Sequence, residues 1–302
     1  MDIAINTDFL GGTGSPEPRL KAIAEAGFTH LHWCHQWNTD FFYCSPEVRQ
    51  YAKWLREFGL QLLDIHGSAG MEKCWYSPVE YQRRAGVELV VNRIIMLHEL
   101  GGTGSLMMHI PAFRDREGYD PAPAARQFEA LRRSLDELMP VLEKYAVRIA
   151  VENMFSDTFE LIGRVMKDYP EKYFGITYDS GHGNIAEGKG MDRLEPYKDR
   201  LQALHLNDND SSGDQHQPPF YGTVDWDRMA KIIAESSYKG RPLSFELAMR
   251  NTPFYEKELE LKQKPENIRA FLHISSYQSS EYSAGRITPL GSSVLAIFAP
   301  VS

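Results

Sequence analysis

The sequence alternates short apolar segments with amphipathic segments about eight times along the chain. Strands are expected at 2–9, 29–35, 60–66, 105–110, 147–153, 173–179, 201–207 and 242–247. Helices are expected at 16–27, 46–59, 77–98, 123–146, 157–168, 191–199, 225–237 and about 256–272. Strands that alternate with helices through short connections form a parallel sheet. Eight such units predict a single-domain α/β fold, the (β/α)8 TIM barrel, with a doubly wound open sheet as the other candidate.

The length of 302 residues fits one barrel domain, for which about 250 residues is typical. We assign residues 1–273 to the barrel. Residues 274–302 are rich in Ser and Gly and have no helical periodicity. We interpret this segment as a C-terminal appendage of unknown role.

Composition indicates the general class to which the protein belongs. The hydrophobic fraction of 42% and the charged fraction of 25% are those of a soluble globular protein. No run of about 18 apolar residues is available to span a bilayer, and the N-terminus has no signal-peptide pattern. The three cysteines are odd in number and predict no disulfide framework. We therefore expect a cytoplasmic protein without a membrane partner, either monomeric or a homo-oligomer.

Polar residues with metal-ligand chemistry end six of the expected strands or follow them closely. They are His66, His109, Glu152, Asp179, His182, His205, Asp214, His216 and Glu246. The carboxyl ends of barrel strands meet at one face, where active sites are built. Carboxylate oxygen and imidazole nitrogen together are ligands for Zn, Mn or Co. The pattern predicts a divalent-metal site at this face.

A structural role is the alternative for each of these residues taken singly. Glu152 and Glu246 are the hardest to explain in that way, because apolar neighbours place each of them inside the barrel mouth. A buried carboxylate needs a cation or hydrogen-bond donors, and an Arg or Lys partner remains the competing explanation. Asp208 and Asp210 are expected to be solvated loop residues or helix caps.

These motifs resemble the xylose-isomerase-like TIM barrels, which include sugar isomerases and epimerases and the apurinic-site endonuclease IV family. The resemblance covers roughly residues 1–272. It rests on ENM at the fifth strand, YDSGHGN at the sixth, HLND, DQH and a Gly-x-Val-Asp-Trp turn after the seventh, and FEL at the eighth.

The resemblance implies two ligand sets. In the epimerase branch four residues hold one divalent metal, and here they would be Glu152, Asp179, His205 and Glu246. In the endonuclease branch three zinc ions are held by a larger set. The additional matches are His66, His109, His182, Asp214 and His216, all of which are present. The ligand set alone therefore leaves both branches open.

The loops favour a sugar substrate over DNA. The loop after the second strand, HQWNTDFFYCS, has aromatic residues and no Arg or Lys, whereas DNA binding depends on basic contacts to phosphates. We expect Trp33 and Trp37 to form a substrate-binding lid, with packing alone as the other explanation. The net charge of −8 also gives no general attraction for nucleic acid.

The predicted activity is a metal-dependent sugar or sugar-phosphate isomerase or epimerase that works by proton transfer through an enediolate. Glu152 and Glu246 are the expected acid/base pair. His66, His109, His182, Asp214 and His216 would bind substrate or a second metal. An endonuclease IV-like phosphodiesterase acting on apurinic DNA is the alternative. The epimerase pattern often has an Arg after the seventh strand, and this chain has none between His205 and Trp226.

Overall fold

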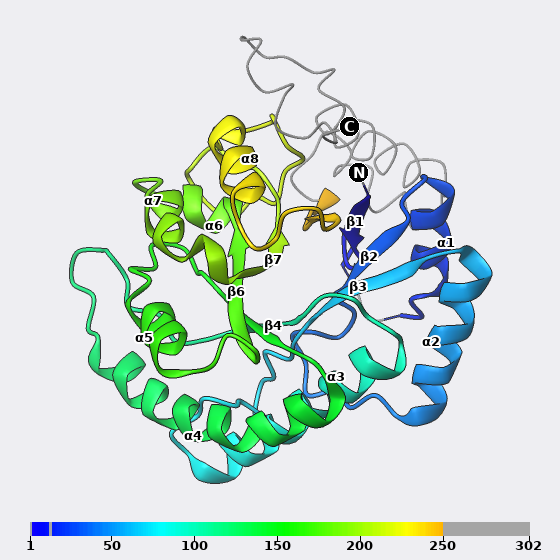
Figure 1. Ribbon diagram of the computed structural model, residues 1–302, viewed down its shortest axis with the longest axis horizontal. Coiled ribbons are helices and arrows are strands. Elements are labelled where there is room, and N and C mark those ends of the chain that lie inside the picture. Colours follow the sequence, from blue (N-terminus) through cyan, green and yellow to red (C-terminus); the bar gives the residue numbers. More distant parts are fainter. Residues whose placement is uncertain (1, 12–13, 250–302) are drawn as a thin grey trace.

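The structure is a computed structural model that describes residues 2–11 and 14–249. Eight strands lie at the centre and helices surround them (Figure 1). The strands are β1 (Ile3–Asn6), β2 (His30–Trp33), β3 (Gln61–His66), β4 (Leu106–His109), β5 (Ile149–Glu152), β6 (Phe174–Asp179), β7 (Leu201–His205) and β8 (Leu243–Phe245).

All neighbouring strands pair in parallel, in the order β7-β6-β5-β4-β3-β2-β1-β8. The residue after β7 joins the two ends of this order. The amide of Leu206 donates to the carbonyl of Ser244, and the amide of Glu246 donates to the carbonyl of Leu206. These bonds close the sheet and confirm the (β/α)8 barrel predicted from the sequence.

The helices lie outside the strands and follow them in chain order (Figure 1). They are α1 (Glu17–Glu25), α2 (Ser45–Phe58), α3 (Glu80–Glu99), α4 (Ala122–Tyr145), α5 (Glu160–Asp168), α6 (Ser180–Asn184), α7 (Gly190–Leu194), the 3-10 helix η1 (Glu195–Arg200) and α8 (Trp226–Ala234). Ser-Pro pairs stand at or shortly before the starts of α1, α2 and α3. In α2 the proline lies in the first turn, where it lacks only an N–H that would have no partner.

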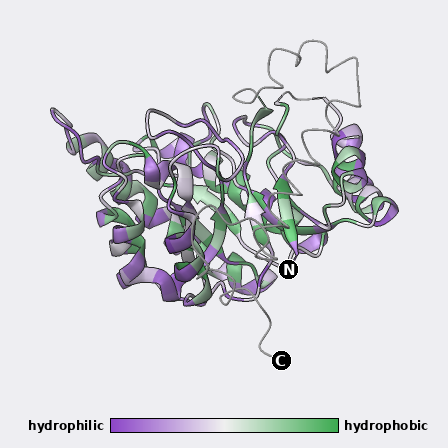
Figure 2. Ribbon diagram, turned by 90° about the horizontal axis from the view of Figure 1, so that it is seen from above, coloured by the Kyte–Doolittle hydropathy of each residue, from purple (hydrophilic) through white to green (hydrophobic). Residues whose placement is uncertain are grey.

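The alternation of side chains along each strand builds two layers. On β5, Ile149 and Val151 join the hydrophobic core between the strands and the helices, whereas Ala150 and Glu152 take the opposite face, toward the barrel interior. Small residues such as Ala4 and Ser244 occupy equivalent positions on other strands and are fully buried. Hydrophobic strands surrounded by helices with polar outer faces are visible from the side (Figure 2).

Two features of the helices differ from the sequence-based expectation. The segment directly after β6, where the sequence predicts no helix, forms the short helix α6. The helix expected at 191–199 divides into α7 and η1. In the described part of the chain no helix has the length and apolarity needed to cross a membrane. The expected helix at about 256–272 and the segment 274–302 lie outside the described residues.

Candidate metal centre

Four side chains meet at the carboxyl end of the barrel. Glu152 ends β5, Asp179 ends β6, His205 ends β7 and Glu246 follows β8. Their ligand atoms lie within 4.8 Å of one another, and all four residues are buried. The Nδ1 atom of His205 lies 2.8 Å from Oε1 of Glu152 and 3.0 Å from Oε2 of Glu246.

The charged groups of this cluster shift one another's pKa values. Burial lowers the pKa of His205, but Glu246 and Glu152 outweigh it and hold that pKa well above its usual value. Burial also acts to raise the pKa of both glutamates, yet His205 keeps each of them below its usual range. Asp179 differs, because burial raises its pKa to about 6 despite the opposing effect of His182.

A second group joins the first through Glu152. His66 at the end of β3 and His109 at the end of β4 have ligand atoms within 4.8 Å of each other and of a Glu152 oxygen. Nε2 of His109 lies 2.9 Å from Oε2 of Glu152. The two atoms are within ion-pair distance, but their orientation is not that of a hydrogen bond. Burial, followed by the charge of His109, lowers the pKa of His66 well below its usual value. Its neutral ring is suited to metal ligation.

A third group joins the first through Asp179. It contains His182 on α6 and His216 in the loop after β7, and its ligand atoms also lie within 4.8 Å. Asp214 approaches both imidazoles, at 2.8 Å from Nε2 of His216 and 3.6 Å from Nε2 of His182. Burial opposes protonation of His216, but Asp214 and Glu246 raise its pKa to about 9. The structure thus brings all nine sequence-predicted residues into one connected group.

His182 lies on the short helix α6, whose position depends on a cap and on a close contact with α7. Asp179 caps α6 by accepting from the amide of His182 at 2.7 Å, and Nδ1 of His182 faces the carbonyl of Asn153 at 2.9 Å. A Cβ atom on Gly190 would lie 2.3 Å from the Cα atom of Gly183. The close approach of α6 and α7 therefore requires glycine at this contact.

Asp208 corrects one expectation from the sequence. It is fully buried rather than solvated, and its two carboxylate oxygens accept from four donors. Those donors are the amides of Asn209, Phe220 and Val224 and the indole Nε1 of Trp226. Asp208 therefore fixes the fold of the loop that presents Asp214 and His216. Asp210, in contrast, is exposed and accepts from Ser212, as expected of a loop residue.

The two tryptophans expected as a lid have different surroundings. The half-buried Trp37 lies over the site, with its ring 4.3 Å from the ring of His66 and 5.7 Å from that of His109. Its Nε1 atom donates to Asp8 at 3.0 Å. Trp33 has no exposed surface and packs against Tyr51 on α2, on the outer face of β2. Its burial corrects the expectation of a lid role, so we retain only Trp37 as a lid candidate.

Three further residues near the site were not singled out from the sequence. His32 on β2 and Asp64 on β3 form a buried pair, with 2.6 Å between Nδ1 and Oδ1. The ring of His32 lies 4.5 Å from that of His205. Asp8, after β1, accepts from Asn6 as well as Trp37. Histidines at alternate positions 30 and 32, and an acid within an apolar strand, were the available signals for the pair.

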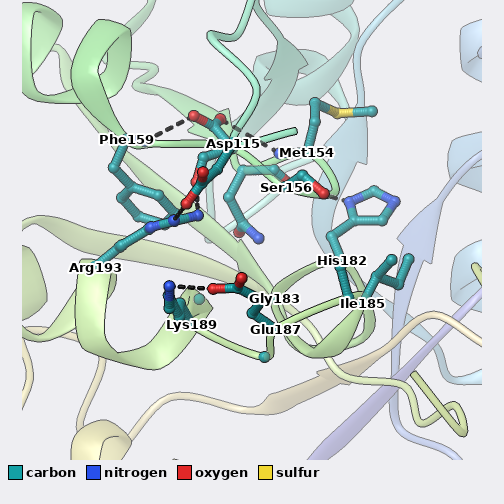
Figure 3. A pocket seen from close by; sticks show the side chains of 15 residues that line it. Asp115, Met154, Ser156, Phe159, His182, Gly183, Ile185, Glu187, Lys189 and Arg193 are labelled. Atoms are coloured by element: carbon teal, nitrogen blue, oxygen red, sulfur yellow. Dashed lines mark hydrogen bonds and ion pairs between the residues drawn. The ribbon is translucent and has the colours of Figure 1, made fainter. Parts of the chain in front are cut away.

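Figure 3 shows a pocket of about 350 Å³, including its open mouth, and the four residues of the cluster are not among those that line it. His182 and Asn153 line it on the side of the cluster, and the chain around α7 lines the other side. Arg193 crosses the pocket wall, donating to the carbonyl of Asp157 and to the carboxylate of Asp115. Its positive charge is thus already paired within the protein.

The donor set fits a divalent cation. Glu152, Asp179 and Glu246 place three buried carboxylates around one imidazole. Over residues 2–11 and 14–249, no Lys or Arg forms an ion pair with any of the three carboxylates. Such a concentration of buried negative charge needs compensation, and three oxygens with one nitrogen are ligands for Zn, Mn or Co.

The comparisons with known proteins agree with this architecture. The family described as "Xylose isomerase-like TIM barrel" matches residues 20–271. An uncharacterized protein of Sinorhizobium fredii is 32% identical over 256 residues, which cover 76% of this chain and 80% of that protein. A D-psicose 3-epimerase of Enterocloster bolteae is 28% identical over 208 residues, covering 64% of this chain and 63% of the epimerase.

Solved structures extend the likeness of fold. A D-psicose 3-epimerase determined in the presence of D-fructose has a TM-score of 0.69 at 14% identity, and the match covers 92% of this chain and 98% of that chain. A D-tagatose 3-epimerase-like protein has a TM-score of 0.68 at 18% identity, with 92% of this chain and 100% of that chain covered. With its family match spanning most of the chain, the protein belongs to the xylose isomerase-like TIM barrel family.

Proposed function

We propose that the protein is a divalent-metal-dependent sugar epimerase or isomerase that acts on a ketose by proton transfer next to the carbonyl. The observation that carries the proposal is the buried group of Glu152, Asp179, His205 and Glu246, whose ligand atoms converge within 4.8 Å. The sugar 3-epimerases among its relatives and structural neighbours support the same class of substrate.

The four residues would hold one Zn, Mn or Co ion. A bound divalent cation polarises the substrate carbonyl and acidifies the adjacent C–H. Binding requires His205 to lose the Nδ1 proton that the two glutamates now stabilise, since a ligand imidazole must be neutral at its donor atom. Metal affinity should consequently fall as the pH is lowered.

Glu152 and Glu246 are the proposed proton carriers. Without a metal each has a pKa below its usual range, because charged His205 outweighs the effect of burial. A bound divalent cation would take over this role from His205 and would keep the carboxylates ionised and able to act as bases. One carboxylate takes the proton of the C–H bond, whose electron pair moves into the enediolate. The other glutamate, after taking a proton from water, delivers that proton to the opposite face of the same carbon and becomes a carboxylate again. Loss of the abstracted proton to water then restores the first glutamate.

The remaining residues shape the substrate site. The exposed part of Trp37 offers an aromatic face above His66 and His109, suited to the apolar side of a sugar. We propose that five residues bind substrate hydroxyls or a second metal, namely His66, His109, His182, Asp214 and His216. As expected from the sequence, we propose a cytoplasmic protein whose partner is a small-molecule sugar.

The test is a panel of ketoses assayed with Mn, Co and Zn in deuterated water. The wild type should epimerise at least one ketose and place solvent deuterium on the carbon next to the carbonyl. Glu246→Gln should lose about 10²–10⁴-fold in kcat, the usual contribution of general acid–base catalysis. Glu99→Gln, an exposed position at the end of α3, is the matched control. Turnover without deuterium incorporation would contradict the proton-transfer mechanism.

A second candidate is an endonuclease IV-like phosphodiesterase. The second and third groups, which include His66, His109, His182 and His216, favour it because they would accommodate further metal ions. Metal stoichiometry separates the two functions. Three tightly bound zinc ions would favour the phosphodiesterase, whereas one ion would favour the epimerase.

A further inference from the structure

Two imidazoles at the bottom of the site each have one ring nitrogen without a hydrogen bond to any residue that the structure describes. These atoms are Nε2 of His32 and Nε2 of His205, and both are buried. Both residues are 0% exposed. Their rings are neighbours, with centroids 4.5 Å apart and planes inclined at 60°. A buried polar atom without a partner is costly, and one contact between these rings would satisfy both atoms.

The partner of Nδ1 in each ring determines whether Nε2 of that ring donates or accepts. His32 places Nδ1 at 2.6 Å from Asp64, a carboxylate that can only accept when ionised. When the ring of His32 carries a single proton, that proton therefore lies on Nδ1, which leaves Nε2 as an acceptor. His205 directs Nδ1 toward Glu152 and Glu246, the position of the proposed metal. Its Nε2 therefore carries a proton and is a donor.

We propose that Asp64 and His32 are positioning residues for the metal ligand His205. In this arrangement Nε2 of His205 donates to Nε2 of His32, and Nδ1 of His32 donates to Asp64. The resulting chain fixes the tautomer and the ring orientation of His205, so that its Nδ1 lone pair faces the three carboxylates. Outer partners of this kind typically change metal affinity by about 10–100-fold.

A competing assignment uses the same nitrogen of His32. His32, Cys34 and Glu246 also have ligand atoms within 4.8 Å and could hold an ion of their own. That arrangement would leave Nε2 of His205 without a partner. The relay instead gives both buried nitrogens a partner through one contact and is therefore favoured.

The direct test is NMR of the histidine rings in the full-length protein, with and without one equivalent of zinc. We expect His32 to be protonated at Nδ1 and unprotonated at Nε2, with a coupling across the hydrogen bond from Nε2 of His205. A proton on Nε2 of His32 would overturn the inference while leaving the proposed function intact. If the protein binds none of Zn, Mn and Co, both the inference and the proposed function fail.

Variants supply a second measurement that does not depend on activity. The double variant His32→Phe/Asp64→Asn removes the acceptor without leaving a buried carboxylate unpaired. Its zinc affinity, measured by competition with a chelator, should fall about 10–100-fold. His32→Gln, which retains an acceptor oxygen, should recover part of the loss. His30→Gln is the matched control on the same strand, since within residues 2–11 and 14–249 the ring of His30 has a hydrogen bond to Thr29 alone.

Two outcomes of these measurements would refute the relay. One is an affinity of the folded double variant within about twofold of the wild type, against the 10–100-fold expected of an outer partner. The other is a thiolate charge-transfer band in the cobalt-loaded wild type that disappears in Cys34→Ser, which would assign His32 to the competing metal site.

Discussion

Replacing Asp208 with Asn should destabilise the protein far more than its loop position indicates. Each carboxylate oxygen accepts two hydrogen bonds. Oδ1 accepts from the amides of Asn209 and Val224, and Oδ2 accepts from the amide of Phe220 and the indole of Trp226. Asparagine has one acceptor oxygen, and its amide group would face two donors. At least two buried donors would then lose their partners.

The magnitude follows from that count. A buried donor left without a partner costs about 1–3 kcal/mol, so two such donors give a loss of about 2–6 kcal/mol in the free energy of unfolding. Proteins are typically stable by only about 5–15 kcal/mol. The variant should thus remain folded near room temperature but unfold at a clearly lower urea concentration.

Urea unfolding followed by circular dichroism measures this effect. The midpoint should fall in Asp208→Asn, with the slope of free energy against urea unchanged. Asp210→Asn is the control, because Asp210 is exposed and only two residues further along the chain, and little change is expected there. A loss below about 1 kcal/mol in Asp208→Asn, less than one such unsatisfied donor costs, would refute the reasoning.

Three further predictions concern different parts of the molecule. Burial raises the pKa of Asp157 to about 6, above the roughly 3.9 of an unfolded chain, so its contribution to stability is greatest below about pH 4 and is lost as the pH rises to about 6. Asp157→Asn should remove this pH dependence, which amounts to about 3 kcal/mol in the free energy of unfolding measured across that range. Trp37→Ala should raise KM about tenfold with little change in kcat, as expected when binding is lost equally in the ground and transition states; a fall in kcat alone would contradict a lid role. Apurinic duplex DNA should show little or no incision, and strong metal-dependent incision that His182→Ala abolishes would reverse the choice between the two functions.

The fold was predictable because the sequence marks where several of the strands end. β3, β5 and β6 end at His66, Glu152 and Asp179, where an apolar run meets a polar residue. The strand before that residue must be buried, and the residue itself must face the barrel mouth. Helix α6 was not predictable in the same way. Its sequence, Ser-Gly-His-Gly-Asn, has no apolar periodicity, and it depends on the cap from Asp179 and on the close contact with α7.

The buried polar contacts behind the site could not be predicted from the sequence either. His32 and Asp64 come from different strands, and only the register of β2 against β3, which pairs these two residues, brings their side chains within 2.6 Å. Asp208 has the same difficulty, because three of its four donors come from residues 220–226. Long-range polar contacts of this kind follow from the closed barrel and from no local pattern. The lid prediction for Trp33 was wrong because its neighbour His32 points into the barrel, so Trp33 lies on the opposite, outer face of β2.

The proposed chemistry depends on how many ions share Glu152. Its Oε1 atom faces His205, and its Oε2 atom faces His109 in the second group. With one ion among the first four residues, Oε2 keeps a lone pair with which Glu152 can accept a substrate proton. An ion held by His66, His109 and Glu152 would engage that oxygen and leave Glu246 as the only available base. A proton transfer between opposite faces needs two carriers, so the number of bound ions, as well as the identity of the ligands, would decide whether this barrel can epimerise a sugar.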